Sequence, residues 1–193
     1  MSIAPKAWRN GGGTTRPLAE AAGGDWRISL ADVQRDGPYS LFPGMDRQSL
    51  VVQGAGVELR NGTDTVALKP GQATEYKGEI EWQATLCDGP VVALNTMVKR
   101  DRYHARVVLL RNDMLVTSGC FALVLPLDGS CTWRTAHSTA ATRLASSTML
   151  VRKAHGPGLS LTPVPSALHG VAAVVVLIET RAPHFSENQG THI

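Results

Sequence analysis

Cysteine is scarce in this chain, and the few cysteines are spaced too widely for most cysteine chemistry. The 193 residues include only Cys87, Cys120 and Cys131. No CxxC pair occurs, which excludes a zinc knuckle or a dithiol redox motif of the usual spacing. We therefore expect all three side chains to act as small buried hydrophobes in a reducing compartment.

Long apolar segments and blocks of like charge are also missing. The longest apolar run covers residues 171–178, whereas a membrane-spanning helix needs about 20 residues. The N-terminal segment has no signal-peptide core. The formal net charge of +3 is spread along the chain, which argues against a nucleic-acid-binding surface. We expect a cytoplasmic protein without membrane or nucleic-acid partners, and the sequence leaves homo-oligomer formation open.

Motifs for catalysis are absent as well. The six histidines stand alone, without the HxH or HExxH pairs that hold catalytic metals. No GxSxG elbow occurs, and no cysteine has a basic or histidine-rich context. Glu75, Glu79 and Glu81 are interpreted as solvated positions on strands. The sequence therefore predicts no metal, no cofactor and no catalytic residue.

Short strands separated by turns dominate what the chain does contain. Apolar segments rich in Val, Leu, Ile and Trp end at Gly, Pro, Asp or Asn. Alternation places Ile80, Trp82 and Leu86 on one face of a half-buried strand, and apolar residues of 26–30 follow the same pattern. The pattern predicts an all-β sandwich or barrel with few short helices, such as one at 17–22.

A faint internal repeat indicates how the strands are organised. The order strand, glycine turn, strand, polar loop, strand, glycine turn, strand occurs twice, at an offset of roughly 75 residues. Two stacked jelly-roll halves would produce this order. We expect one unit over residues 1–193, with approximate halves 1–105 and 106–193, and a single irregular sandwich is the alternative.

The segment 43–54 occupies the place where metal-binding cupin barrels usually carry two histidines and a glutamate. Its glycines remain, but histidine is absent, and Arg47, Ser49 and Gln53 lie at even spacing on one strand face. If this face points into the barrel, Arg47 is suited to grip a carboxylate through two parallel hydrogen bonds. The alternative places Arg47 at the barrel rim, paired with Asp46 or another surface acid.

The glycine-rich segment 8–16 is the second candidate. Its three consecutive glycines allow tight turns and an anion-binding nest of backbone amides. The segment lacks the spacing of a phosphate loop, and a flexible loop is the plain alternative. Against that alternative, Trp8 can anchor the segment while Asn10, Thr14 and Thr15 hydrogen-bond across a pocket mouth.

These segments together resemble the HutD/Ves family, a group of metal-free, cupin-like proteins associated with histidine utilisation. The resemblance implies a double cupin-like (RmlC-like jelly-roll) barrel whose pocket binds a small carboxylate such as formylglutamate or urocanate. It implies a pocket role for Arg47, with Asn10, Thr15 and Asn95 as further ligand-binding residues, and it leaves the role of Arg27 open. The matching segments are 8–16, 25–33, 36–47, 53–56 and 95–97, with a nearby arginine at position 100.

Two departures from the family pattern bear on the ligand. This chain has Ala93-Leu94 where the family commonly has an acid and Phe, and Pro17 where a Glu often follows. A missing acid removes a charge or hydrogen-bond partner from the pocket wall, so ligand preference can differ from that of relatives.

Three functions follow from these observations. We favour a regulatory, small-molecule-binding protein of histidine degradation, because no general base or nucleophile is evident. The alternative is a metal-independent isomerase, hydrolase or epimerase of a small organic acid, since the fold alone does not exclude chemistry. An interaction module with a vestigial pocket is the third option, and it predicts Arg47 buried against protein acids.

Overall fold

The computed structural model describes residues 4–8, 11–127, 129–146, 148–164 and 171–182. All regular elements in these ranges are β-strands, which confirms the all-β prediction. The helix expected at 17–22 is wrong, because β2 (Gly13–Glu20) runs through Pro17 and is followed by a turn. No helix in the described ranges has the length and hydropathy to cross a membrane.

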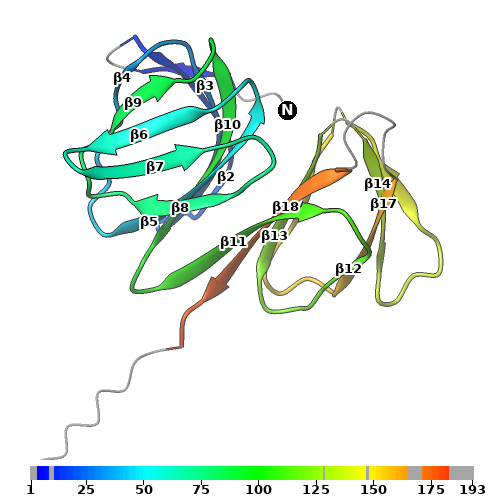
Figure 1. Cartoon of the computed structure of the whole chain (residues 1–193). Coiled ribbons are helices and arrows are strands. Elements are labelled where there is room, and N and C mark those ends of the chain that lie inside the picture. Colours follow the sequence, from blue (N-terminus) through cyan, green and yellow to red (C-terminus); the bar gives the residue numbers. More distant parts are fainter. Residues whose placement is uncertain (1–3, 9–10, 128, 147, 165–170, 183–193) are drawn as a thin grey trace, which may run out of the picture.

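The strands of the described ranges form four sheets, and all pairings within these sheets are antiparallel. Strands β1 to β10 build one pair of sheets and β11 to β18 build the other (Figure 1). The strands are β1 (Lys6–Ala7), β2 (Gly13–Glu20), β3 (Trp26–Val33), β4 (Gly37–Pro38), β5 (Met45–Gln53), β6 (Val57–Asn61), β7 (Asp64–Leu68), β8 (Thr74–Lys77), β9 (Gln83–Leu86), β10 (Val91–Lys99), β11 (Tyr103–Leu110), β12 (Met114–Val116), β13 (Phe121–Pro126), β14 (Ser130–Thr135), β15 (Thr142–Leu144), β16 (Leu150–Arg152), β17 (Leu159–Val164) and β18 (Ala173–Thr180).

The strand order of the first half recurs in the second. The first half has the order β1-β2-β3-β10-β5-β8 facing β4-β9-β6-β7, and the second has β11-β18-β13-β16 facing β12-β17-β14-β15. Apart from β1 and β2, each strand of the first half therefore has a counterpart eight strands later. This order is that of a jelly roll, so the faint sequence repeat reflects two jelly rolls in series.

Three apolar clusters hold the described part of the molecule together. One fills the first barrel and includes Val33, Val51 and Trp82. A second fills the other jelly roll, and the third joins the two, where Leu50 and Val176 pack between the six-stranded sheet and the sheet of β11, β18, β13 and β16. The six-stranded sheet is therefore covered on one face by the second half, and its other face lines the first barrel.

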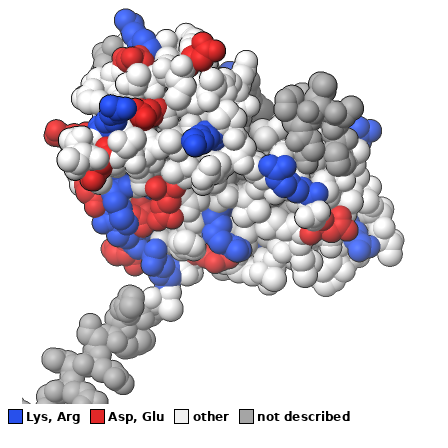
Figure 2. Space-filling view, viewed as in Figure 1, with Lys and Arg blue, Asp and Glu red and all other residues white. Residues whose placement is uncertain are grey.

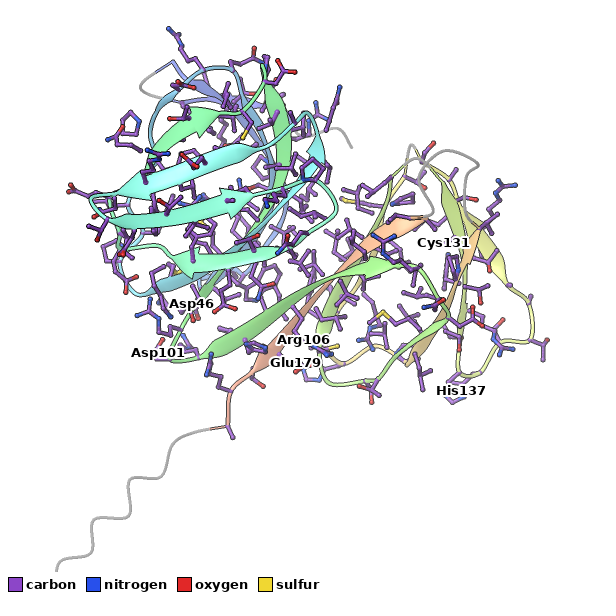
Figure 3. The ribbon with its side chains drawn as sticks, in the orientation of Figure 1. Asp46, Asp101, Arg106, Cys131, His137 and Glu179 are labelled. Atoms are coloured by element: carbon purple, nitrogen blue, oxygen red, sulfur yellow. The ribbon has the colours of Figure 1, made fainter. Side chains whose placement is uncertain are left out.

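The predicted strand alternations agree with the burial pattern. Trp26 and Ile28 lie in the cluster between the halves, and Trp82 lies in the first barrel, although β9 begins one residue after it. The cysteine prediction is correct for Cys120 and Cys131, and burial raises the pKa of the Cys131 thiol, which lies in the second half (Figure 3). For Cys87 the prediction is wrong: this residue follows β9 in a turn and is exposed.

The glycine-rich segment is packed rather than open in its described part. A Cβ atom on Gly13 would lie 2.1 Å from the carbonyl oxygen of Asp32, so only glycine permits this approach of β2 to β3. The backbone amide of Gly11 donates to Trp8, and the Gly11 carbonyl accepts from Arg35 at 2.6 Å. The described glycines therefore serve strand packing, and the anion nest considered above is not their evident use.

Charges of both signs are interspersed on the face that Figure 2 shows. Arg106 on β11 and Glu179 on β18, which lie side by side in Figure 3, form such an exposed pair at 3.8 Å. Exposed pairs of this length contribute little to stability, on the order of 0–1 kcal/mol.

Candidate functional site

Polar side chains collect inside the first barrel, at one end of the six-stranded sheet. Because side chains alternate along a strand, the inward positions of β3, β10 and β5 form layers across the sheet. One layer is Ala31, Ala93 and Val51, which is apolar. The next two layers are polar: Ser29, Asn95 and Ser49, then Arg27, Met97 and Arg47.

Arg47 is the most enclosed charge in this region. It is 5% exposed, and its guanidinium carbon lies 4.9 Å from the ring centroid of Tyr76, 5.3 Å from that of Phe42 and 5.4 Å from that of Tyr39. Aromatic faces attract a cation, by about 0.5–2 kcal/mol each depending on desolvation. They do not neutralise it, because a ring accepts no ionic hydrogen bond of the strength a carboxylate offers.

Most hydrogen-bond donors of the Arg47 guanidinium have no acceptor among the described residues. Its Nη1 donates to the Ser40 carbonyl at 3.4 Å, which is long for such a bond. Its Nε is buried without a partner, and Nη2 has no hydrogen bond to another described residue. A buried donor without an acceptor costs about 1–3 kcal/mol, and more when it carries charge. The folded protein thus keeps a buried cation in the wall of the cavity, with few acceptors among the described residues.

Arg152 provides an internal comparison in the second half. It is 6% exposed, and its Nη2 donates to the carbonyls of Thr117 and Cys120 at 2.9 Å each. Its Nη1 donates to the carbonyls of Gly156 and Pro157 at 3.3 and 3.1 Å. Nε is unpaired in both arginines, so the difference lies in the Nη groups. Arg152 has the bonding of a structural arginine that ties loops together, and Arg47 does not.

The nearby acids are already paired with other cations. Asp46 accepts hydrogen bonds from Lys77 and Arg100 at 2.7 Å each. Burial of Asp46, which lies low in the first barrel in Figure 3, opposes ionisation, but these bonds outweigh it and lower the pKa of its carboxyl group. Among the described residues, Arg47 forms no ion pair within 4.0 Å. The alternative of a rim arginine paired with Asp46 is therefore wrong.

A hydrogen-bonded chain fixes the side chain of Asn95 beside Arg47. The Ser49 hydroxyl donates to Oδ1 of Asn95, so the Tyr76 hydroxyl donates to Ser49 Oγ, at 2.8 Å. This arrangement orients the amide and leaves its Nδ2 without a partner among the described residues. Because Asn95 lines the same cavity as Arg47, its Nδ2 is a second donor for an anion.

The mouth of the cavity is formed by β1, β2 and the segment after β4. Trp8 donates from Nε1 to the Thr15 hydroxyl at 2.7 Å, and its ring meets the Tyr39 ring edge-on at 6.3 Å. Thr15 belongs to β2, and Trp8 and Thr15 are the described residues of the glycine-rich segment that line the cavity. Lys6 and Glu20 also line the cavity and are exposed.

Arg27 is the residue that the sequence left unassigned, and the structure places it in the same cavity. Its guanidinium carbon lies 5.4 Å from the Phe42 centroid, and Nη2 lies 3.8 Å from the sulfur of Met97. The alternation of side chains along the strand could have predicted this position. Trp26 and Ile28 pack between the two halves, so Arg27 faces the opposite side of the sheet.

The cavity has a volume of about 270 Å³, which suits a ligand smaller than drug size. Burial raises the pKa of the Tyr39 hydroxyl well above its ordinary value, with nearby Tyr76 adding to the shift and Arg47 opposing it. Tyr39 therefore stays protonated near neutral pH and acts as a hydrogen-bond donor, not as a base. Glu20 is the single carboxylate among the described lining residues, and it lies in solvent at the mouth.

The predicted site residues are partly brought together. Arg47, Thr15 and Asn95 line the one cavity, whereas Asn10 lies outside the described residues. The strand face argued for Arg47 and Ser49 does point into the barrel, but Gln53, at its end, is exposed. Whether these residues bind a ligand stays a prediction.

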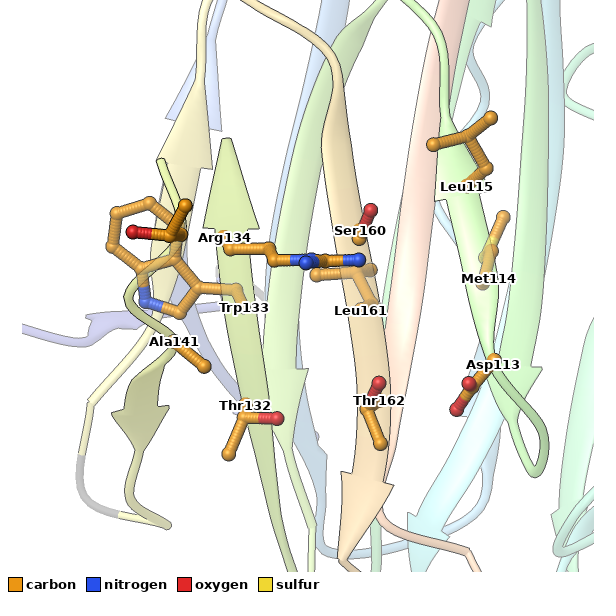
Figure 4. Close-up of a pocket in the computed structure, with 11 residues that line it drawn as sticks. Asp113, Met114, Leu115, Thr132, Trp133, Arg134, Ala141, Ser160, Leu161 and Thr162 are labelled. Atoms are coloured by element: carbon orange, nitrogen blue, oxygen red, sulfur yellow. The ribbon is translucent and has the colours of Figure 1, made fainter. Parts of the chain in front are cut away.

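A larger hollow of about 480 Å³ lies on the outer face of β12, β17 and β14 (Figure 4). Arg134, Ser160 and Leu115 are register partners across this face, and Leu115 is 70% exposed. Its one cation among the described lining residues, Arg134, is exposed. Despite the greater volume, we place the functional site in the first barrel, because its described lining includes a buried charge, Arg47, without an ion-pair partner among the described residues.

The side chains of the described residues form no group of three or more His, Cys, Asp or Glu placed to hold a metal ion. The donors gathered around Arg47 are guanidinium, amide and hydroxyl groups. Guanidinium is never a metal ligand at neutral pH, so this donor set fits an anion better than a cation.

Comparison with known proteins shows sequence similarity to curated relatives over about half of the chain. An uncharacterized 21.2 kDa protein in the hutC 3' region of Pseudomonas putida is 33% identical over 106 residues. Protein Ves of Citrobacter koseri is 38% identical over 106 residues. Each match covers 52% of this chain and 56% of the relative, so it spans about half of these curated proteins.

Solved structures match over nearly the whole chain. HutD from Pseudomonas fluorescens SBW25 has a TM-score of 0.75 at 24% identity, covering 93% of this chain and 95% of its own. A conserved protein of unknown function from Pseudomonas aeruginosa PAO1 has a TM-score of 0.77 at 25% identity, with the same coverage.

A cupin 2 conserved barrel domain protein from Leptotrichia buccalis has a TM-score of 0.57 at 12% identity, covering 93% of this chain and 92% of its own. These likenesses confirm the cupin-like fold. The family model for HutD matches residues 2–164. Because this range includes most of the chain, the chain belongs to the HutD family.

Proposed function

We propose that this protein binds a small carboxylate of histidine degradation, formylglutamate or urocanate, and acts as a regulatory protein. The observation that carries the proposal is the buried Arg47 guanidinium, which no described acid neutralises. The family and the relative named for the hutC 3' region of P. putida support the link to histidine utilisation.

Capture of the ligand follows from the donors around Arg47. A carboxylate that enters the cavity accepts two parallel hydrogen bonds from the guanidinium fork, and Nδ2 of Asn95 is placed to donate a third. The rings of Tyr39, Phe42 and Tyr76 keep water away from the pair. A desolvated charge pair is stronger than an exposed one, because less solvent screens it.

Binding without turnover agrees with the titratable groups of the cavity. A general base must lie within hydrogen-bond reach of the bound substrate and be deprotonated at working pH. The raised pKa of Tyr39 removes it as a base, and Glu20 lies at the exposed mouth. The remaining lining residues that the structure describes offer cations, hydroxyls and an amide.

The proposal is tested by calorimetric titration of the protein with formylglutamate and with urocanate. We expect saturable binding of at least one acid, and loss of that binding in Arg47→Ala. Arg16→Ala is the matched control, because it removes one exposed positive charge from β2 without touching the cavity. Unchanged affinity in Arg47→Ala, with the control also unchanged, contradicts the proposal.

A further inference from the structure

Arg27 and Arg47 lie in one layer of the six-stranded sheet. Met97 on β10 is the register partner of Arg27 on β3 and also of Arg47 on β5. All three side chains line the cavity. The barrel therefore presents two guanidinium groups to the same space, separated by one thioether side chain.

Both guanidinium groups pack on the same aromatic ring. Their central carbons lie 5.4 and 5.3 Å from the centroid of Phe42, for Arg27 and Arg47 respectively. Two like charges on one ring repel each other, most strongly where solvent is excluded. The fold holds them together without an ion-pair partner for either among the described residues.

Both groups have few hydrogen-bond acceptors among the described residues. Nε is buried and unpartnered in each. Among the described residues, the Nη atoms of Arg27 have one hydrogen-bond acceptor, the sulfur of Met97, which is a weak acceptor. Glu20 is the register partner of Arg27 and lines the mouth, but it is exposed and forms no ion pair with Arg27 within 4.0 Å. Lys6 is the other charged group at this mouth, and it adds positive charge.

We infer that the ligand is a dicarboxylate, with one carboxylate on Arg47 and the second on Arg27, and that Arg27 determines this specificity. The inference rests on the proposed function and deepens it. Two anionic groups neutralise two cations, and each fork-shaped guanidinium matches a planar carboxylate. Because both groups contact one ring, a short carbon chain between the carboxylates is long enough to reach both.

The test compares glutarate, which has two carboxylates, with glutaramate, in which an amide of the same shape replaces one of them. Calorimetric titrations use the wild-type chain, Arg27→Gln, Arg47→Gln and the control Arg16→Gln. We expect wild type to bind glutarate about tenfold to a hundredfold more tightly than glutaramate, as one charge-assisted contact implies. Arg27→Gln removes this preference, because it weakens glutarate binding far more than glutaramate binding, whereas Arg47→Gln weakens the binding of both acids.

Arg27→Lys keeps the charge but loses the planar fork, so we expect it to retain part of the preference for glutarate. This variant also separates a specificity role from a folding defect, because a merely structural role of Arg27 would weaken the binding of both acids to the same extent. Equal binding of both acids by wild type, with both lost in Arg47→Gln, overturns the inference while the proposed function stands. If wild type binds neither these acids nor the acids of the proposed function, both fail.

Discussion

Replacing Arg47 by methionine is expected to remove ligand binding without weakening the fold. Methionine has a similar length, makes favourable sulfur–aromatic contacts and fits a cage of Tyr39, Phe42 and Tyr76. The substitution loses three cation–π contacts, worth about 0.5–2 kcal/mol each. It also removes an unsatisfied donor that costs about 1–3 kcal/mol and a buried, unpaired charge that costs several more.

These opposing contributions predict a small net change in the free energy of unfolding of the ligand-free protein. We expect Arg47→Met to lie between a loss of about 1 kcal/mol and a gain of about 2 kcal/mol. Arg152→Met is the matched comparison, because Arg152 is equally buried but donates to four carbonyls. That variant leaves the buried Cys120 carbonyl and three more exposed carbonyls without this donor, and it should lose about 2–3 kcal/mol.

Urea denaturation followed by circular dichroism measures both variants, and comparison requires equal m-values. The same samples, melted with and without excess ligand, report binding, since a ligand at a hundred times its Kd stabilises by about 2.7 kcal/mol. Arg47→Met should lose this ligand-induced stabilisation. A destabilisation as large as that of Arg152→Met would show that Arg47 is a structural residue, and the reasoning for the site would be refuted.

Four further predictions concern individual side chains. The pKa of Asp46 is lowered in the folded state, so its stabilising contribution is complete above the unfolded pKa of about 3.9 and is lost as pH falls through the folded value. Unfolding free energies measured between about pH 2 and 6 should therefore show a smaller acid loss in Asp46→Asn than in wild type; equal slopes would contradict this. Gly13→Ala should lower the melting temperature by several degrees, because its Cβ would clash with a neighbouring strand carbonyl, whereas Gly62→Ala, at a turn with open space, should cost less. Glu20→Gln removes the negative charge at the cavity mouth, so titration at low salt should show tighter carboxylate binding by a factor of about two to five, and the gain should disappear at high salt; a weaker complex would rule out this repulsion. A thiol reagent should modify Cys87 in the native protein and the two buried cysteines only after unfolding, as peptide mass spectrometry can check.

The relative affinity for formylglutamate and urocanate connects the proposed function with the role inferred for Arg27. Formylglutamate carries two carboxylates and urocanate carries one, so a site with both Arg27 and Arg47 should bind formylglutamate more tightly. Competition calorimetry of the two acids measures the difference directly. Preference for urocanate would leave the role of Arg47 intact and exclude the role assigned to Arg27.

Much of the fold follows from local patterns in the sequence. The alternation around Trp26 and Trp82 reports which face of a strand is buried, because side-chain direction has period 2 whatever the strand pairs with. The same rule brings Arg47 and Ser49 to one face. The expectation for Pro17 failed because propensity over a few residues is overridden by pairing with β3, where a register shift accommodates the proline.

Other features depend on contacts between distant parts of the chain. The exposure of Cys87 and Gln53 is decided by where the strands end, which local composition determines poorly. The second arginine was visible in the sequence, but its shared layer with Arg47 requires the register of β3 and β5 against β10.

The sequence by itself determined that this chain is built of short strands, and that Arg47 and Ser49 share one strand face where histidines are absent. These are properties of side-chain order along one strand. Only the tertiary structure showed that Arg47 is buried without an acidic partner among the described residues. It also showed that Asp46 is hydrogen-bonded to Lys77 and Arg100, and that Arg27 lines the same cavity as Arg47. The physical reason is that an ion pair or a cavity is a relation between strands, and strand pairing over long sequence separations is fixed by the packing of the whole sheet.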